Sequence, residues 1–227
     1  RRRIQEYISA SPKMPELDAP DEYSRLFEVA YPSPADRREY IDRKIKMGRP
    51  SKGHVAMALL MRSGFVKRVW TTNFDAIVED AFANFGGSTA DLIVADIEKA
   101  SVAQQAFSDD RWPLYLKLHG DFRSESIKNT TAELSTQDEI LKRLFKEFCC
   151  TSGLIVTGYS GRDDSIMEIF EEALAHERPF PNGLFWLRRE DTELLPRVKS
   201  LLIAAYEKGV ECAVVPIENF DETLFDL

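Results

Sequence analysis

Polar groups that could bind or activate a substrate directly follow three apolar runs of this chain. They are "TTNFD" at residues 71–75, "HGD" at 119–121 and "YSGRDD" at 159–164. The second group sets an imidazole between an apolar run and a glycine, and a glycine lets a ligand approach the backbone closely. The third group, with the glycine before it, is rich in small residues whose backbone N–H groups suit a ribose or a pyrophosphate. This pattern favours a polar small-molecule site.

Each of these groups also has a purely structural interpretation. Thr72 and Asn73 could cap the helix that follows them, because side-chain oxygens satisfy free N–H groups at a helix start. Asp163 and Asp164 are also typical of a helix start, where the macrodipole favours negative charge. His119 could be a structural hydrogen-bonding residue. The functional interpretation therefore rests on the three groups occurring together, each at the end of an apolar run.

The three polar groups can form one site only if the order of strands and helices brings them together. Short apolar runs alternate with amphipathic segments, which predicts an α/β fold with a Rossmann-like parallel sheet and helices on both faces. In such a sheet a ligand binds beyond the carboxyl ends of the strands. The strands are expected at 66–70, 91–95, 113–118, 154–158, 184–188 and 212–217, and the intervening helices at 75–85, 137–148, 164–176 and 192–209.

The first fifty residues have a different character. Prolines separate three short helical segments, expected at 1–8, 21–30 and 33–47. We therefore expect residues 1–50 to form a small helical layer and residues 51–227 to form the Rossmann-like domain. A further helix is expected at 54–61.

Composition narrows the function further. The formal charge of −8 argues against direct nucleic-acid binding, and no apolar run is long enough to span a membrane. Cys149, Cys150 and Cys212 have no spacing typical of a zinc site or a disulfide framework. We interpret them as buried thiols of a cytoplasmic protein. His54 and His176 lie within helical periods and are assigned to packing or to the surface.

The three motifs, "TTNFD", "KLHGD" and "VTGYSGRDDSIM" in this order, resemble the SIR2-like domain of bacterial antiphage defence proteins, which are divergent relatives of the sirtuins. The resemblance covers about Ser51 to the end of the sequence. It implies a domain that binds NAD and breaks its nicotinamide–ribose bond. That bond breaks through a cationic ribose, so the site must hold negative dipoles near this carbon and position a water molecule.

The resemblance also implies roles for individual residues. Asn73 would orient the nicotinamide amide or the attacking water, and Asp75 would support that geometry. His119 would act as general base, since its reference pKa of about 6.5 allows it to accept a proton near neutral pH. The implied catalytic residues are Asn73 and His119, and the implied NAD-binding residues are Thr72, Asp75, Gly158, Ser160, Gly161 and Arg162.

Two features depart from the family pattern. Sirtuin deacylases carry a zinc module held by paired CxxC motifs, which this sequence lacks, so no zinc is expected and protein deacylation is the less favoured activity. The family's glycine-rich GAGxS strand-turn-helix, which surrounds the pyrophosphate, is also not in the sequence. Because Arg1–Arg3 look like part of a helix already under way, we expect the parent protein to extend upstream.

Three functions remain open at this stage. The first is an NAD glycohydrolase that depletes NAD during antiphage defence. The second is a module that senses NAD or ADP-ribose without turnover, and the third is an NAD-dependent deacylase. The resemblance further implies oligomerisation and a sensor domain or subunit, such as an Argonaute-like protein or an ATPase. Residues 121–136 are polar and long for a connection, so they are either an ordered lid, a partner contact or an exposed loop.

Overall fold

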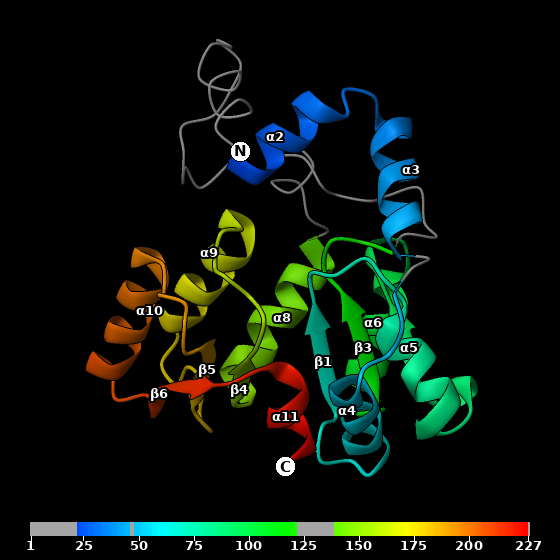
Figure 1. Ribbon diagram of the computed structural model, residues 1–227. Helices are drawn as coiled ribbons and strands as arrows, with labels where there is room; N and C mark the ends of the chain where they lie inside the picture. The colour runs from blue at the N-terminus through cyan, green and yellow to red at the C-terminus, as the bar shows by residue number, and fades with distance from the viewer. Residues whose placement is uncertain (1–21, 46–47, 122–138, 227) are drawn as a thin grey trace.

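The computed structural model describes residues 22–45, 48–121 and 139–226 (Figure 1). Within these ranges the chain forms parallel strands joined by helices, which confirms the predicted α/β, Rossmann-like class. The strands pair as two three-stranded ladders, where the sequence predicts one sheet. The first ladder has the order β1-β3-β2 and the second the order β4-β5-β6.

The first sheet is covered by helices on both faces. It consists of β1 (Arg68–Thr71), β2 (Ile93–Ala95) and β3 (Leu114–Lys117), and every residue of β3 is buried. Alternate residues of β3 point to opposite faces. Tyr115 belongs to a cluster with residues of α4 (Lys52–Arg62) and α5 (Ile77–Ala81), while Leu114 and Leu116 belong to the main core with α6 (Ala100–Ser108) and α8 (Glu139–Thr151).

The second sheet is covered on one face and open on the other. It consists of β4 (Leu154–Val156), β5 (Leu184–Arg189) and β6 (Cys212–Ile217). Leu184 and Trp186 lie in the main core with residues of α9 (Asp164–Leu174) and α10 (Pro196–Glu207). On the opposite face Ile155, which is aligned with Phe185 and Ala213, is 62% exposed. Within the described residues, this apolar face is therefore in contact with solvent.

Local sequence explains where the main helices begin and which face they bury. In α8 the buried residues recur at helical spacing, so one stripe faces the core and the charged stripe faces solvent. The carboxylate of Asp163 caps α9, and Pro196 occupies the first turn of α10. Among the described helices, none is both long enough and apolar enough to cross a lipid bilayer.

Most of the predicted elements are confirmed. All six strands form with ends within two residues of the predicted ones, and α2 (Glu22–Ala30) and α3 (Pro34–Ile45) match the expected helices. Within the described residues, two α-helices were not predicted: α6 and the short α11 (Phe220–Phe225), which packs against α4. The helix expected at 1–8 and most of the segment 121–136 lie outside the described residues, and the boundary near residue 50 stays a prediction.

The turn between β4 and α9 packs closely against α10 at Gly161. This glycine has a φ of +79°, and a Cβ added to it would lie 2.3 Å from Cγ2 of Val198. Gly158, in the same turn, has a φ of +67° but no atom within 4 Å of an added Cβ. Gly161 is therefore required by packing as well as by conformation, whereas Gly158 leaves open space in front of the backbone.

This contrast can be measured with two glycine variants. We expect Gly161→Ala to lower the free energy of unfolding by about 1–2 kcal/mol through left-handed strain and by a further ~1–3 kcal/mol through overpacking against Val198. Gly158→Ala should show the first loss alone, because its added Cβ meets no neighbour. Urea unfolding followed by tryptophan fluorescence provides the comparison, and equal losses in the two variants would contradict the packing role.

Candidate functional site

The parallel pairing of β1 with β3 brings the first two motifs to the same edge of the sheet. Thr71 is aligned with Lys117, and the N–H of Leu118 donates to the carbonyl of Thr71 at 2.8 Å. The segments 72–75 and 118–121 therefore leave the sheet side by side. The ring of Phe74 lies 6.3 Å from the imidazole of His119, centroid to centroid.

Local hydrogen bonds shape the turn that carries Asn73 and Asp75. The N–H of Asn73 donates to Oγ1 of Thr71 at 3.0 Å, and Oδ1 of Asp75 accepts from the N–H of Ile77, also at 3.0 Å. Asp75 thus closes the turn before α5, as a capping carboxylate does. The side chain of Asn73 is exposed and that of Thr72 is half-buried. The turn therefore presents a carboxamide to solvent at the edge of the sheet.

A buried lysine joins this turn to the end of β3. Lys117 is fully buried, and its Nζ donates to the backbone carbonyl of Asp75 at 2.7 Å and to Oδ2 of Asp121 at 2.6 Å. The same Nζ lies 3.0 Å from Oε2 of Glu79 in α5. The ammonium group therefore joins the turn after β1, the segment after β3 and helix α5.

The third motif reaches His119 through Asp163. Nε2 of His119 contacts Oδ2 of Asp163, and both side chains are largely buried. Oδ1 of Asp163 accepts hydrogen bonds from the N–H and the hydroxyl of Ser165 and from the N–H of Ile166. Burial by itself would raise the pKa of Asp163, but the hydrogen bond and charge of His119, together with the bonds from Ser165 and Ile166, bring the pKa below its ordinary value. Asp163 is therefore a stable anion next to the imidazole.

The remaining residues of the third motif divide between the exposed and the packed side of the turn. Gly158, Ser160 and Arg162 are exposed, while Gly161 is buried against α10. Tyr159 packs against Trp186, and its hydroxyl donates to the carbonyl of Asp163 at 3.3 Å. Burial raises the pKa of Tyr159, so its hydroxyl stays neutral.

The structure thus brings together some of the predicted site residues and leaves others apart. His119 lies beside the turn of Asn73 and Asp75 and contacts the start of α9. Within the described ranges, no direct hydrogen bond joins Asn73 to His119 or to the exposed residues of the third motif. The connections run instead through Phe74, Lys117 and Asp163.

Two residues of this network were missed as site residues from the sequence. Lys117 gave a usable signal, since a lysine inside the apolar run "PLYLKL" must lie either at an edge or in a buried ion pair. Asp163 was considered only as a helix cap. That role is confirmed, but the contact of its second oxygen with His119 depends on how the second sheet packs against the first.

His54 has the structural role expected for it. Its Nδ1 accepts from the N–H of Ser51, and its ring packs 5.2 Å from that of Phe220 in α11. The hydroxyl of Ser51 contacts both His54 and Asp221, so the imidazole does not lie between the serine and the acid. Burial lowers the pKa of His54, an effect partly opposed by the charges of Asp75 and Asp221. This cluster fastens α11 to the start of α4.

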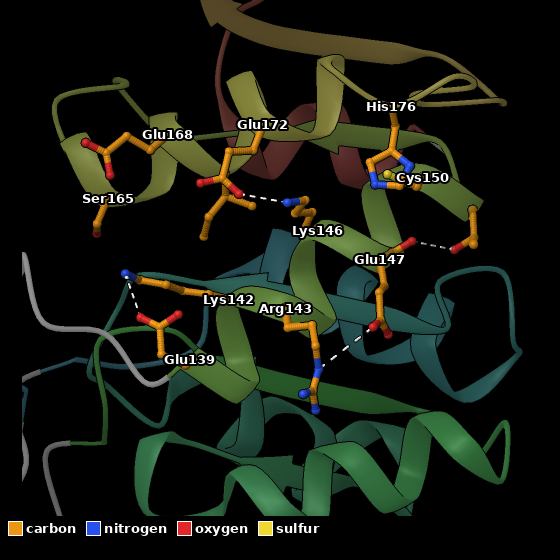
Figure 2. A pocket seen from close by; sticks show the side chains of 12 residues that line it. Glu139, Lys142, Arg143, Lys146, Glu147, Cys150, Ser165, Glu168, Glu172 and His176 are labelled. Atoms are coloured by element: carbon orange, nitrogen blue, oxygen red, sulfur yellow. Dashed lines mark hydrogen bonds and ion pairs between the residues drawn. The ribbon is translucent and has the colours of Figure 1, made fainter.

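A cavity of about 500 Å³ lies between α8 and α9 and touches the site only through Ser165 (Figure 2). Each basic side chain of its wall lies near an acid: Lys142 near Glu139 at 3.4 Å, Arg143 near Glu147 at 3.8 Å and Lys146 near Glu172 at 2.9 Å. Burial raises the pKa of Cys150 in its wall, an effect partly offset by Lys146. The wall therefore offers no activated thiol and no excess of positive charge for an anion.

Metal-ligating residues do not cluster in the described part of the chain. Across those residues, no group of three or more histidine, cysteine, aspartate or glutamate side chains is arranged to hold an ion. Cys149 is buried and carries a pKa raised by burial, so it is a packed thiol.

Comparison with known proteins identifies a family model that matches most of the chain. The model for the SIR2-like domain matches residues 67–210, which is more than half of the 227 residues. This range includes the three motifs from β1 to the start of α9. No curated protein matches the sequence.

The buried lysine allows a direct test of how this region is held together. We expect Lys117→Met to lower the free energy of unfolding by about 3–5 kcal/mol, because it leaves the buried carboxylates of Glu79 and Asp121 without this cation. Lys146→Met is the matched control, since it removes an exposed ion pair worth only about 0–1 kcal/mol. Thermal and urea unfolding measure both changes, and a cost for Lys117→Met no larger than that of the control would contradict the anchoring role.

Proposed function

The chain belongs to the SIR2-like domain family, a sirtuin-related group of NAD-binding domains, and on this basis we propose that it is an NAD glycohydrolase. The proposed reaction is hydrolysis of the bond between nicotinamide and ribose, which yields nicotinamide and ADP-ribose. The supporting observation is that a buried imidazole with a carboxylate partner lies beside the turn that presents Asn73. A general base and a positioning amide are the two groups that this hydrolysis needs.

The surroundings of each residue favour a different role in this reaction. His119 accepts a proton from a ribose hydroxyl or from the attacking water. The exposed carboxamide of Asn73 orients the nicotinamide amide or the water molecule. Asp75 supports the turn, because one of its oxygens accepts the N–H of Ile77 and its carbonyl accepts from Lys117.

The turn after β4 suits the ribose and phosphate part of NAD. A Cβ added at Gly158 would meet no atom within 4 Å, so a ligand can approach this backbone closely. Ser160 and Arg162 are exposed beside it and supply a hydroxyl and a positive charge. Asp163 already occupies the N–H groups of Ser165 and Ile166, so we expect the phosphates to bind to the turn and to Arg162 and not to the first turn of α9. Thr72, with its side chain half-buried, borders the same edge from β1.

The proposed biological role follows from the family. We assign the activity to the effector step of a bacterial antiphage defence system in the cytoplasm, where NAD depletion would be switched on by a sensor domain or subunit and by oligomerisation. Proteins in such a role act on a small molecule, so this domain itself needs no nucleic-acid contact. Its net charge of −8 is unfavourable for nucleic-acid binding and so supports a role limited to the small molecule.

The activity is tested by incubating the full chain with NAD and separating the products. We expect nicotinamide and ADP-ribose to appear. Asn73→Ala should slow turnover by about 10²- to 10³-fold, the usual loss when a preorganised hydrogen-bonding group is removed. His119→Gln should slow it by about 10²- to 10⁴-fold, the usual contribution of a general base. The matched control is His176→Gln, which changes an exposed histidine beyond the end of α9 and should leave the rate unchanged.

The same experiment separates the alternatives. Binding of NAD without products would support a sensing module, and products that appear only with an acylated peptide would support a deacylase. A wild-type rate in Asn73→Ala would count against the assigned site. Circular dichroism and melting of each variant check that the fold is retained.

A further inference from the structure

The carboxylate of Asp163 uses its two oxygens for two different tasks. Oδ1 accepts from Ser165 and Ile166 at the start of α9, and Oδ2 faces Nε2 of His119. Because the first oxygen is held by three hydrogen bonds, the carboxylate cannot rotate without uncapping the helix. The second oxygen is therefore held in place by the cap.

This arrangement favours one tautomer of the His119 ring. Nε2 of His119 contacts Oδ2 of Asp163, and an ionised carboxylate only accepts hydrogen bonds, so this contact favours the tautomer of His119 with its hydrogen on Nε2. In the neutral ring, the lone pair then lies on Nδ1. Within the described part of the chain, Nδ1 has no hydrogen-bond partner.

Neighbouring groups do not compete with Asp163 for the imidazole. Lys117 and Asp121 lie on the same strand end as His119, but they pair with each other at 2.6 Å. The carbonyl of Asp75 accepts from Lys117 as well. Phe74 contributes only an apolar ring beside His119. Of Lys117, Asp121 and Asp163, only Asp163 contacts Nε2 of His119.

We propose that Asp163 is the positioning residue of His119, and that by holding Nε2–H it makes Nδ1 the nitrogen that accepts the proton in catalysis. The catalytic part of this inference rests on the proposed glycohydrolase function. In that reaction a hydroxyl or water proton moves to Nδ1, the ring becomes positively charged, and the anion of Asp163 stabilises that charge. No group other than the substrate and these two side chains is needed for the transfer.

An isosteric pair of variants tests the proposal. Asp163→Asn keeps an oxygen for the helix cap, because asparagine caps as well as aspartate. Its amide N–H₂ would face Nε2 and donate to it, which moves the ring hydrogen to Nδ1. Asp164→Asn is the matched control: it makes the same chemical change one residue away, where the carboxylate pairs with Arg197 at 2.5 Å on the surface.

Two readouts are needed, and the first does not depend on activity. Nitrogen-15 NMR of labelled histidine, with the His119 signal assigned from His119→Gln, should show hydrogen on Nε2 in the wild type and in Asp164→Asn. In Asp163→Asn the hydrogen should be on Nδ1. The second readout is steady-state NAD hydrolysis, where kcat should fall by about 10²-fold or more in Asp163→Asn with KM unchanged, as expected for loss of a base that acts only in the transition state.

Each outcome decides between the two proposals. An identical His119 tautomer in Asp163→Asn and Asp164→Asn would overturn the positioning role. Equal kcat values for the two variants, with NAD cleaved by the wild type, would also overturn it while leaving the glycohydrolase function intact. A tautomer that shifts to Nδ1 in Asp163→Asn, together with a wild-type protein that does not cleave NAD, would uphold the positioning role and refute the proposed function.

Discussion

The site depends on one buried cation. An ammonium group removed from water costs several kcal/mol unless acceptors surround it, so Lys117 can be buried only where its partners are already in place. Here they are Glu79, Asp121 and the carbonyl of Asp75, which belong to three different segments. Because the lysine lies two residues before His119, satisfying its charge also sets the distance between the imidazole and the turn of Asn73.

A second constraint joins the two sheets at the same place. Asp163 follows β4 of the second sheet, yet its carboxylate contacts a histidine that follows β3 of the first. The two ladders share an apolar core but not a strand pair in the described residues, so this polar contact aligns the end of one sheet with the end of the other. A movement of either sheet would alter the environment of the imidazole, which makes the site sensitive to how the sheets pack.

Element prediction succeeded where periodicity is strong and failed where it is weak. The six strands and α8 follow from runs of apolar residues at the spacing of their structure. The segment of α6, "ASVAQQAFS", buries only small alanines along one stripe, and α11 has six residues, so neither gave a clear pattern. The open face around Ile155 was also missed, because an apolar strand predicts burial but not which neighbour supplies it.

Local patterns alone were sufficient to predict the strand ends, the polar groups after them and the family, because these depend on residues adjacent in the chain. The tertiary contacts of Gly161, Lys117 and Asp163 could not be predicted in this way. The packing demand for glycine at 161 comes from Val198, and the partners of Lys117 come from α5 and two turns. The partner of His119 lies 44 positions away, at the start of α9. Those contacts form only when segments distant in the sequence pack together and exclude water. A buried charge then costs free energy unless a partner lies beside it, and only the folded chain supplies that partner.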